Sequence, residues 1–185
     1  MPHCPTTIHD VSGRKVLVFD GLFDERRIAN FCHVLMQLPY ERRESFDGEL
    51  NAILDNEAFM AAPFLYPVLC ELLAEHRSGL EIPERTELSH VYAAATGRGE
   101  QPQIHMDLES PDALTFLYYG NACWRRDWQG ETVFYDAEGQ AAVVVSPRPG
   151  RLVMFHSNIA HRGGAPHRDA PTFRYAVSAF YYPQQ

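Results

Sequence analysis

The chain has 185 residues, a length that suits one domain with a sizeable hydrophobic core. It is 45% hydrophobic and 12% aromatic, which indicates a globular protein rather than a disordered one. Its formal net charge is -8, from 16 Lys and Arg against 24 Asp and Glu, and this acidity argues against bulk binding to nucleic acid, which needs a basic surface.

The first residues lack the apolar core of a signal peptide, and no apolar run approaches the length of a membrane span. We therefore expect a cytoplasmic protein that binds neither membranes nor nucleic acid, and the sequence leaves its oligomeric state open. Four cysteines are widely spaced and include no C-x-x-C pair, so we expect free thiols at Cys4, Cys32, Cys70 and Cys123.

The first predicted elements are a strand and two helices. The strand covers Lys15 to Phe23, is rich in Val and ends at a Gly turn. Asp24 can cap the helix that follows, in which apolar residues recur at helical spacing. A second helix is predicted from about Glu57 to Arg77, with an irregular first half because Pro63 and Pro67 interrupt it.

After Pro83 the sequence consists of short β-like runs separated by Gly, Pro, Asn and Asp. Many short strands at this spacing predict a β-sandwich or barrel. We therefore expect one domain over residues 1–185, with helical N-terminal support over about 1–85 and a β-rich core over about 86–183. The predicted strands are LSHVYAAA, PQIHMDL, ALTFLYYG, ETVFYD, AAVVVS, RLVMFH and TFRYAVSAFYY.

His105 and Asp107 stand two residues apart in the run PQIHMDL. If residues 104–108 are extended, these two side chains share one face and their apolar neighbours take the other. Two good metal ligands then converge from one short piece of backbone. The alternative is a hydrogen-bonded His–Asp pair in a partly buried strand, since the pattern H-x-D often arises by chance.

A metal site would need a further ligand, and three histidines lie downstream. His156 ends the apolar run RLVMFH, His161 follows a short polar segment, and His167 lies in a Pro-bounded loop. Their spacing alone does not choose among them.

The last predicted strand places Arg174, Ala176 and Ser178 on one face. An arginine inside an apolar strand is costly unless it is paired. Ala176 leaves space beside the guanidinium and Ser178 adds a hydroxyl, so this face is suited to a carboxylate, which arginine binds with two parallel hydrogen bonds. The alternative is an edge-strand arginine whose head group lies in water.

In this order along the chain, the motifs resemble the prolyl-hydroxylase-like family of Fe(II)/2-oxoglutarate-dependent dioxygenases. The resemblance covers about Leu88 to Tyr182, roughly half of the chain. It implies an all-β core with N-terminal helices, arranged as a double-stranded β-helix, which is a jelly-roll or cupin-like barrel. The matching motifs are His105-Met106-Asp107, Tyr118-Tyr119-Gly120-Asn121, Gly130-Glu131-Thr132, Gly150-Arg151-Leu152-Val153-Met154-Phe155, His161 and Arg174-Tyr175.

The resemblance implies an Fe(II) site. It selects His161 as the distal ligand, because the family places a histidine a short polar segment after the strand that ends in Phe155. His161 would join His105 and Asp107 as the catalytic metal ligands and leave the opposite coordination positions open.

The resemblance also implies a 2-oxoglutarate site. Arg174 would bind the far carboxylate of 2-oxoglutarate, with the Tyr119 hydroxyl as its partner, and Ser178 and Tyr92 would line the same pocket. The gap between His161 and Arg174 is longer than in many relatives, so Arg168 is a weaker rival for the carboxylate.

The implied reaction uses O2 and converts 2-oxoglutarate to succinate and CO2 while an unactivated C–H bond is hydroxylated. Asp107 argues against a halogenase, since related halogenases lack this carboxylate. The compact chain favours a small amino-acid-like or natural-product substrate over the side chain of a protein, as in peptidyl prolyl hydroxylation. Two hypotheses of a different class are a non-enzymatic ligand-binding barrel and a zinc hydrolase, since zinc also accepts two histidines and a carboxylate.

The loop NACWRRDWQG, Asn121 to Gly130, is predicted to cover the site and contact the substrate. Trp124 and Trp128 would supply an apolar wall, as ligand sites usually need. Arg125 and Arg126 supply two adjacent positive charges in an acidic chain, which would suit a substrate with an apolar body and a carboxylate or phosphate. The alternative is a solvated loop whose tryptophans pack on the outside of the barrel.

Overall fold

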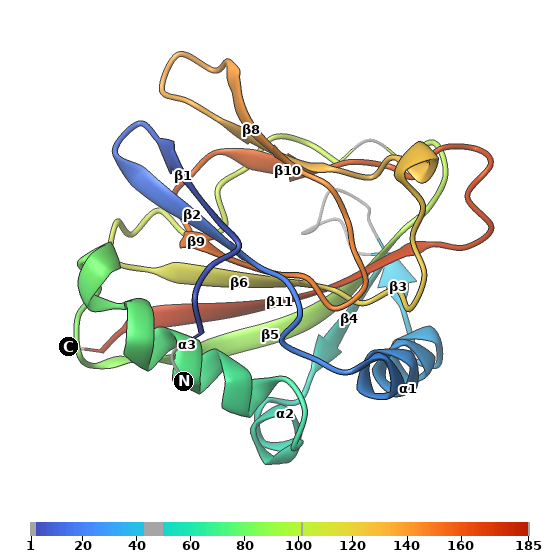
Figure 1. Ribbon diagram of the computed structural model, residues 1–185, viewed down its shortest axis with the longest axis horizontal. Helices are drawn as coiled ribbons and strands as arrows, with labels where there is room; N and C mark the ends of the chain where they lie inside the picture. The colour runs from blue at the N-terminus through green and yellow to red at the C-terminus, as the bar shows by residue number, and fades with distance from the viewer. Residues whose placement is uncertain (1–2, 43–49, 101, 185) are drawn as a thin grey trace.

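Two antiparallel sheets face each other in the computed structural model, which describes residues 3–42, 50–100 and 102–184. Helices cover the outer face of the larger sheet, and the smaller sheet lies on its other side (Figure 1). This arrangement confirms the predicted fold class, a β core with N-terminal helices. None of the helices in the described ranges is long and apolar enough to cross a membrane.

The larger sheet contains eight strands in the described residues, and neighbouring strands are antiparallel throughout. Their order across the sheet is β1 (Thr7–Val11), β2 (Arg14–Phe19), β9 (Leu152–His156), β6 (Leu114–Tyr119), β11 (Arg174–Pro183), β5 (Thr86–Thr96), β4 (Leu50–Leu54) and β3 (Glu41–Arg42). The smaller sheet has the order β10 (His161–Gly163), β7 (Thr132–Tyr135) and β8 (Ala141–Val145).

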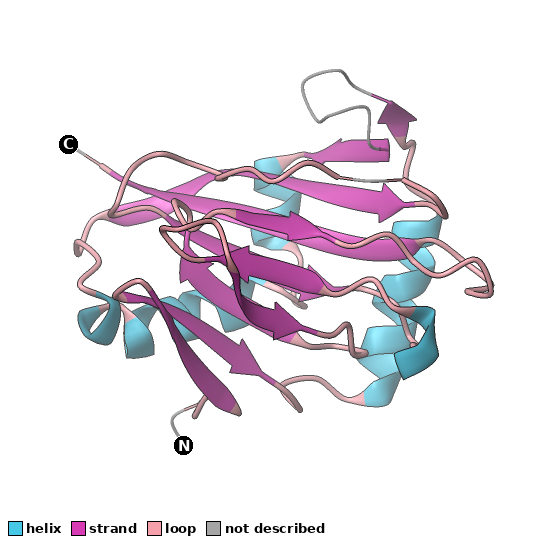
Figure 2. Ribbon diagram, turned by 90° about the horizontal axis from the view of Figure 1, so that it is seen from above, coloured by secondary structure: helices cyan, strands magenta, loops and turns pink. Residues whose placement is uncertain are grey.

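The helices α1 (Glu25–Met36), α2 (Asn56–Ala61) and α3 (Tyr66–His76) bury their apolar sides against the outer face of the larger sheet (Figure 2). Leu35 of α1 and Leu72 of α3 join a core that includes Val177 of β11. The side chain of Asp24 accepts a hydrogen bond from Arg27 N, which confirms the predicted cap of α1.

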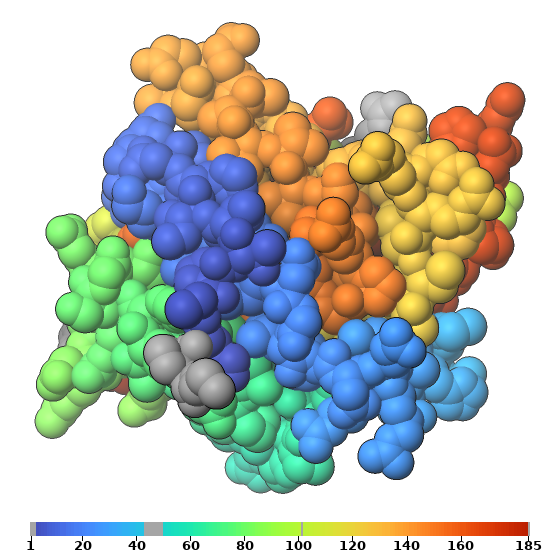
Figure 3. Space-filling model, viewed as in Figure 1, coloured from blue at the N-terminus to red at the C-terminus, as the bar shows by residue number. Residues whose placement is uncertain are grey.

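A second core fills the space between the two sheets, where Leu117, Phe134 and Phe155 meet. The β1–β2 hairpin contacts β8, and the space-filling view shows the hairpin in blue against this orange part of the chain (Figure 3). The alternation of side chains along each central strand therefore sends one set toward the helices and the other into this inner space.

Three expectations from the sequence are wrong in detail. The N-terminal part contains more strands than the one predicted over Lys15 to Phe23, because β1, β3 and β4 also extend the larger sheet. The helix predicted from Glu57 to Arg77 is two helices, since Pro63 forces the preceding Ala62 into an extended conformation. Residues 104–108 do not form a strand, and only His105 makes an isolated β-bridge, because the Asp107 N–H donates to Ser157 O instead.

Gly150 lies just before β9 and packs closely against Ile28 of α1. Its φ is +70°, and a Cβ there would lie 2.5 Å from Ile28 Cδ1. We expect Gly150→Ala to lower the free energy of unfolding by clearly more than the ~1–2 kcal/mol that a left-handed residue costs alone, because Ile28 must also move. Denaturant unfolding would measure this loss.

Gly139→Ala is the matched control, because Gly139 has a φ of +77° and no atom within 4 Å of the added Cβ. Gly139→Ala should lower the free energy of unfolding only by the ~1–2 kcal/mol that a left-handed residue costs. Equal losses for the two variants would contradict the close packing of α1 against the start of β9.

Candidate functional site

Two backbone hydrogen bonds join His105 to His161. His105 N donates to His161 O and His161 N donates to His105 O, each over 2.9 Å. The paired residues of such an antiparallel bridge project their side chains to the same side. The imidazole centroids accordingly lie 4.7 Å apart, although the two residues come from distant parts of the chain.

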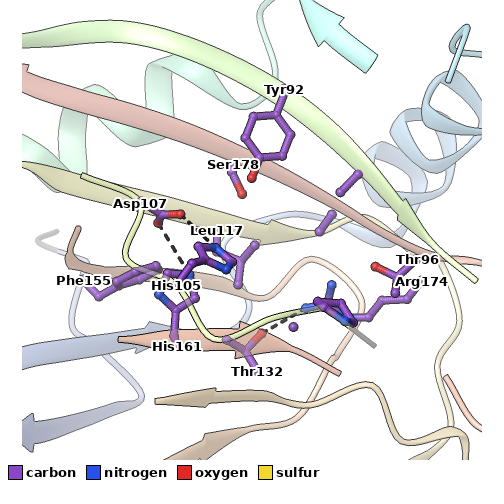
Figure 4. Close-up of a pocket in the computed structure, with 14 residues that line it drawn as sticks. Tyr92, Thr96, His105, Asp107, Leu117, Thr132, Phe155, His161, Arg174 and Ser178 are labelled. Carbon is purple, nitrogen blue, oxygen red and sulfur yellow. Dashed lines mark hydrogen bonds and ion pairs between the residues drawn. The ribbon is translucent and has the colours of Figure 1, made fainter. Parts of the chain in front are cut away.

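Asp107 completes a cluster of three donor side chains. Its Oδ1 lies 3.5 Å from His105 Nε2, and its Oδ2 lies 3.6 Å from His161 Nε2. One ligand atom from each residue lies within 4.8 Å of the other two, and Figure 4 shows the three side chains converging. The side chains of Asp107 and His161 are 6% and 8% exposed, whereas His105 is 40% exposed and marks the open side of the cluster.

The hydrogen bonds of the two rings orient their lone pairs toward Asp107. His105 Nδ1 lies 3.0 Å from Gln103 O, and His161 Nδ1 lies 2.9 Å from Ile159 O. A carbonyl oxygen only accepts, so each Nδ1 carries a proton, and in the neutral form of each ring Nε2 presents its lone pair. Two lone pairs and a carboxylate that face one another repel unless a cation lies between them, so the donors fit a divalent metal.

The protonation states also suit a metal. Burial lowers the pKa of the His161 imidazole below its ordinary value, against the opposing effect of the Asp107 carboxylate. Burial would by itself raise the pKa of Asp107, but His161, His105 and a hydrogen bond from Thr115 together hold that pKa below its usual value. Both groups are therefore unprotonated near neutral pH, which is the form that binds metals.

Arg174 lies in the same cavity as the three donors. It is only 4% exposed, and its Nη2 donates to Thr132 Oγ1 over 2.9 Å. Its Nε is buried and has no hydrogen-bond partner among the described residues. A buried guanidinium with an unused N–H suits an anion, since an unpaired buried cation is strongly unfavourable.

Thr132 supplies the hydroxyl that faces Arg174 in the cavity. In the sequence, Thr132 is marked only as part of a family motif. Thr132 lines the cavity, and Tyr119 lies behind it, with its hydroxyl 2.8 Å from Thr132 Oγ1 and 3.1 Å from Val145 O. The Tyr119 ring also packs on the guanidinium, with Arg174 Cζ 5.1 Å from its centroid. The Gly-Glu-Thr motif was the available signal for Thr132.

Asn121 fixes the backbone on both sides of Arg174. Its Oδ1 accepts a hydrogen bond from Tyr175 N over 2.8 Å, and its Nδ2 donates to Phe173 O over 2.9 Å. This buried clamp explains why an asparagine follows β6, and the sequence reasoning assigned it no role in the site.

The remaining predicted cavity residues also face the site. Tyr92 of β5 and Ser178 of β11 are paired across the two strands, and both line the cavity (Figure 4). Arg168, the rival of Arg174, has a side chain that is 87% exposed and lies beside Asp169.

The two remaining downstream histidines lie away from the cluster. His156 projects from the opposite side of β9, and its Nε2 lies 3.0 Å from Leu80 O. His167 Nδ1 lies 3.4 Å from an Asp169 oxygen. Of the three downstream histidines, His161 is therefore the one that the fold brings to His105 and Asp107.

The predicted substrate loop lies near Arg174 but does not line the cavity. Arg125 pairs with Asp127 over 2.7 Å, Arg126 is exposed, and Trp124 packs against Trp128. A Cβ at Gly130 would lie 3.3 Å from Trp124 and 3.1 Å from Arg174, so the loop supports the outer side of the arginine. Its contact with a substrate stays a prediction.

Residues 89–182 match the sequence family described as the 2OG-Fe(II) oxygenase superfamily. No curated protein sequence matches the chain.

Several solved structures share the fold. A prolyl-4-hydroxylase from Pseudomonas putida has a TM-score of 0.68 and 17% identity, over 92% of this chain and 93% of that one. A prolyl hydroxylase from Trichoplax adhaerens, in complex with a hypoxia inducible factor oxygen degradation domain peptide fragment, has a TM-score of 0.69 and 19% identity, over 91% and 83%. HygX from Streptomyces hygroscopicus, with nickel and 2-oxoglutarate bound, has a TM-score of 0.61 and 16% identity, over 91% and 83%.

Proposed function

The chain belongs to the 2OG-Fe(II) oxygenase superfamily, and from this premise we propose that it hydroxylates an unactivated C–H bond of a small amino-acid-like or natural-product substrate, with succinate and CO2 as co-products. Its cofactors are those of the superfamily, namely Fe(II), 2-oxoglutarate and O2. Membership makes the chain an enzyme, which removes the non-enzymatic barrel and the zinc hydrolase from consideration. A cytoplasmic location stays a prediction.

The observation that carries this proposal is that one cavity holds both a cluster of metal donors and a buried arginine. His105, Asp107 and His161 would hold Fe(II), and Arg174 would hold the far carboxylate of 2-oxoglutarate. The iron, when bound with 2-oxoglutarate and O2, supplies the oxidising chemistry, and the protein contributes orientation and a site shielded from water.

The unused Nε of Arg174 and the Thr132 hydroxyl are the groups best placed to bind that carboxylate. Tyr119 would act mainly by holding Thr132 and by packing on the guanidinium. Tyr92 and Ser178 would line the space between the metal and the arginine.

A small substrate is supported by a structural neighbour that is an epimerase from nogalamycin biosynthesis, with a TM-score of 0.67 and 16% identity. The second candidate is a peptidyl prolyl hydroxylase. It is favoured by the similarity to the Pseudomonas putida and Trichoplax adhaerens prolyl hydroxylases, the latter solved with a peptide fragment.

We expect His161→Ala to lose most of the Fe(II) affinity, more than the ~10–100-fold that loss of an outer hydrogen-bond partner costs, together with succinate formation. Iron content after anaerobic loading and succinate release would be measured. His156→Ala and His167→Ala are the controls and should retain both. Iron lost in either control but kept in His161→Ala would reassign the distal ligand.

We expect Arg174→Ala to weaken 2-oxoglutarate binding by about 100-fold or more, because a buried charge-assisted contact is removed. Arg174→Lys should recover only part of the affinity, since an ammonium cannot form two parallel hydrogen bonds. Thr132→Val should weaken binding by about tenfold, and Tyr119→Phe by less. Calorimetric titration with Mn(II) as the metal would measure these constants.

The control for this series is Arg168→Ala, which should bind 2-oxoglutarate like the wild type because the side chain is exposed. Normal affinity in Arg174→Ala, or a larger loss in Tyr119→Phe than in Thr132→Val, would contradict the arrangement.

Turnover with two matched substrate panels would test the substrate class. One panel contains free amino acids and small natural products, and the second contains proline-bearing peptides. We expect product formation, seen as a mass gain of one oxygen with stoichiometric succinate, in the first panel. Products found only in the peptide panel would favour the prolyl hydroxylase instead.

A further inference from the structure

We infer that Thr115, itself held by Ser157, is a positioning residue that sets the orientation of the Asp107 carboxylate toward the metal. This inference rests on the proposed metal-binding role of Asp107. Thr115 Oγ1 donates to Asp107 Oδ2 over 2.7 Å, and Thr115 Oγ1 lies 2.9 Å from Ser157 Oγ.

Thr115 has one hydroxyl proton, and the contact with Asp107 fixes its direction. An unprotonated carboxylate only accepts, so Thr115 must donate to Asp107 and accept from Ser157. The two hydroxyls thus form a directed chain from Ser157 through Thr115 to Asp107. Thr115 and Ser157 are 1% and 0% exposed, so water does not compete for these bonds.

The carboxylate needs such a partner because its own torsion is soft. The last torsion of an aspartate is broad and roughly two-fold, so rotation of the carboxylate costs little by itself. The two imidazoles restrain it less, since their Nε2 atoms lie 3.5 and 3.6 Å from its oxygens, beyond the usual hydrogen-bond distance. The Thr115 hydroxyl is therefore the hydrogen-bond donor that fixes the plane of the carboxylate among the contacts described.

Ser157 restrains the same ligand in a second way. Its carbonyl accepts hydrogen bonds from Asp107 N over 2.9 Å and from Leu108 N over 3.4 Å. Ser157 N donates to Ala113 O over 2.9 Å, just before the strand that carries Thr115. The backbone of Ser157 thus places Asp107, and its hydroxyl acts through Thr115 on the carboxylate.

Thr115 stands out in its strand. It faces the inner space from β6, where it pairs with Phe155 of β9 and Phe180 of β11. A valine would have nearly the same shape and would avoid burying a hydroxyl, so packing alone does not explain a threonine there. The hydrogen bond to Asp107 does.

Thr115→Val tests the inference, because it removes the hydroxyl and keeps the shape. We expect the Co(II) dissociation constant to rise about 10–100-fold, the usual effect of losing an outer partner of a metal ligand. The visible absorption of bound Co(II), which reports the ligand geometry, should also change. Thr115→Ser should restore both, since the hydroxyl returns.

Ser157→Ala should cause a smaller rise, because the backbone bonds to Asp107 remain. Thr86→Val is the matched control, since Thr86 is a buried threonine that donates to Pro83 O and does not line the cavity. It should lose stability but bind Co(II) with the wild-type constant and spectrum.

Asp107→Ala separates failure of the inference from failure of the proposed site. If Asp107→Ala binds Co(II) like the wild type, Asp107 is not a ligand and the proposed site itself is wrong. If Asp107→Ala loses Co(II) while Thr115→Val and Ser157→Ala keep the wild-type constant and spectrum, the site stands and the positioning role is overturned.

Discussion

The pair of backbone hydrogen bonds between His105 and His161 is the constraint on which the site depends. Each bond measures 2.9 Å. Together they hold the imidazoles of two distant segments close together, on the same side of the bridge. Asp107 follows two residues later and is tied through its backbone to Ser157, which lies between β9 and His161. The three candidate metal ligands are therefore placed by main-chain bonds, which bring one ligand atom of each within 4.8 Å of the other two.

The central strand β11 connects this cluster to the far end of the cavity. Its inward side chains run from Ser178 past Ala176 to Arg174, so the small Ala176 leaves open space between the metal donors and the guanidinium. Both ends rely on threonine hydroxyls, Thr115 of the neighbouring strand β6 at Asp107 and Thr132 of β7 in the smaller sheet at Arg174. The same strand turns its outer face to the helices, so the packing of the outer core and the geometry of the cavity share one backbone.

The sequence predicts those parts of the site whose residues would be energetically unfavourable without a binding partner. Arg174 stands out because a buried charge needs a partner, and the structure does bury it. The strands β5, β6, β7, β8, β9 and β11 overlap runs that the sequence predicts, whereas β3, β4 and the short β10 carry no such signal. Thr115 gives no signal because a β-branched residue in a strand needs no special explanation, and Thr132 is marked only by the Gly-Glu-Thr motif. Residues 104–108 were wrongly predicted as a strand, because alternating side chains are typical of a strand paired along its length. Here a single bridge at His105 and the hydrogen bond from Asp107 N to Ser157 O hold the segment.

A crystal structure grown without O2, with Fe(II) and 2-oxoglutarate, tests the central claim most directly. The account predicts one ion bound by His105 Nε2, His161 Nε2 and an Asp107 oxygen, with the far carboxylate of 2-oxoglutarate on Arg174 and Thr132. It also predicts that the Asp107 carboxylate keeps its bond to Thr115. An ion on different residues, or a 2-oxoglutarate carboxylate away from Arg174, would contradict the account.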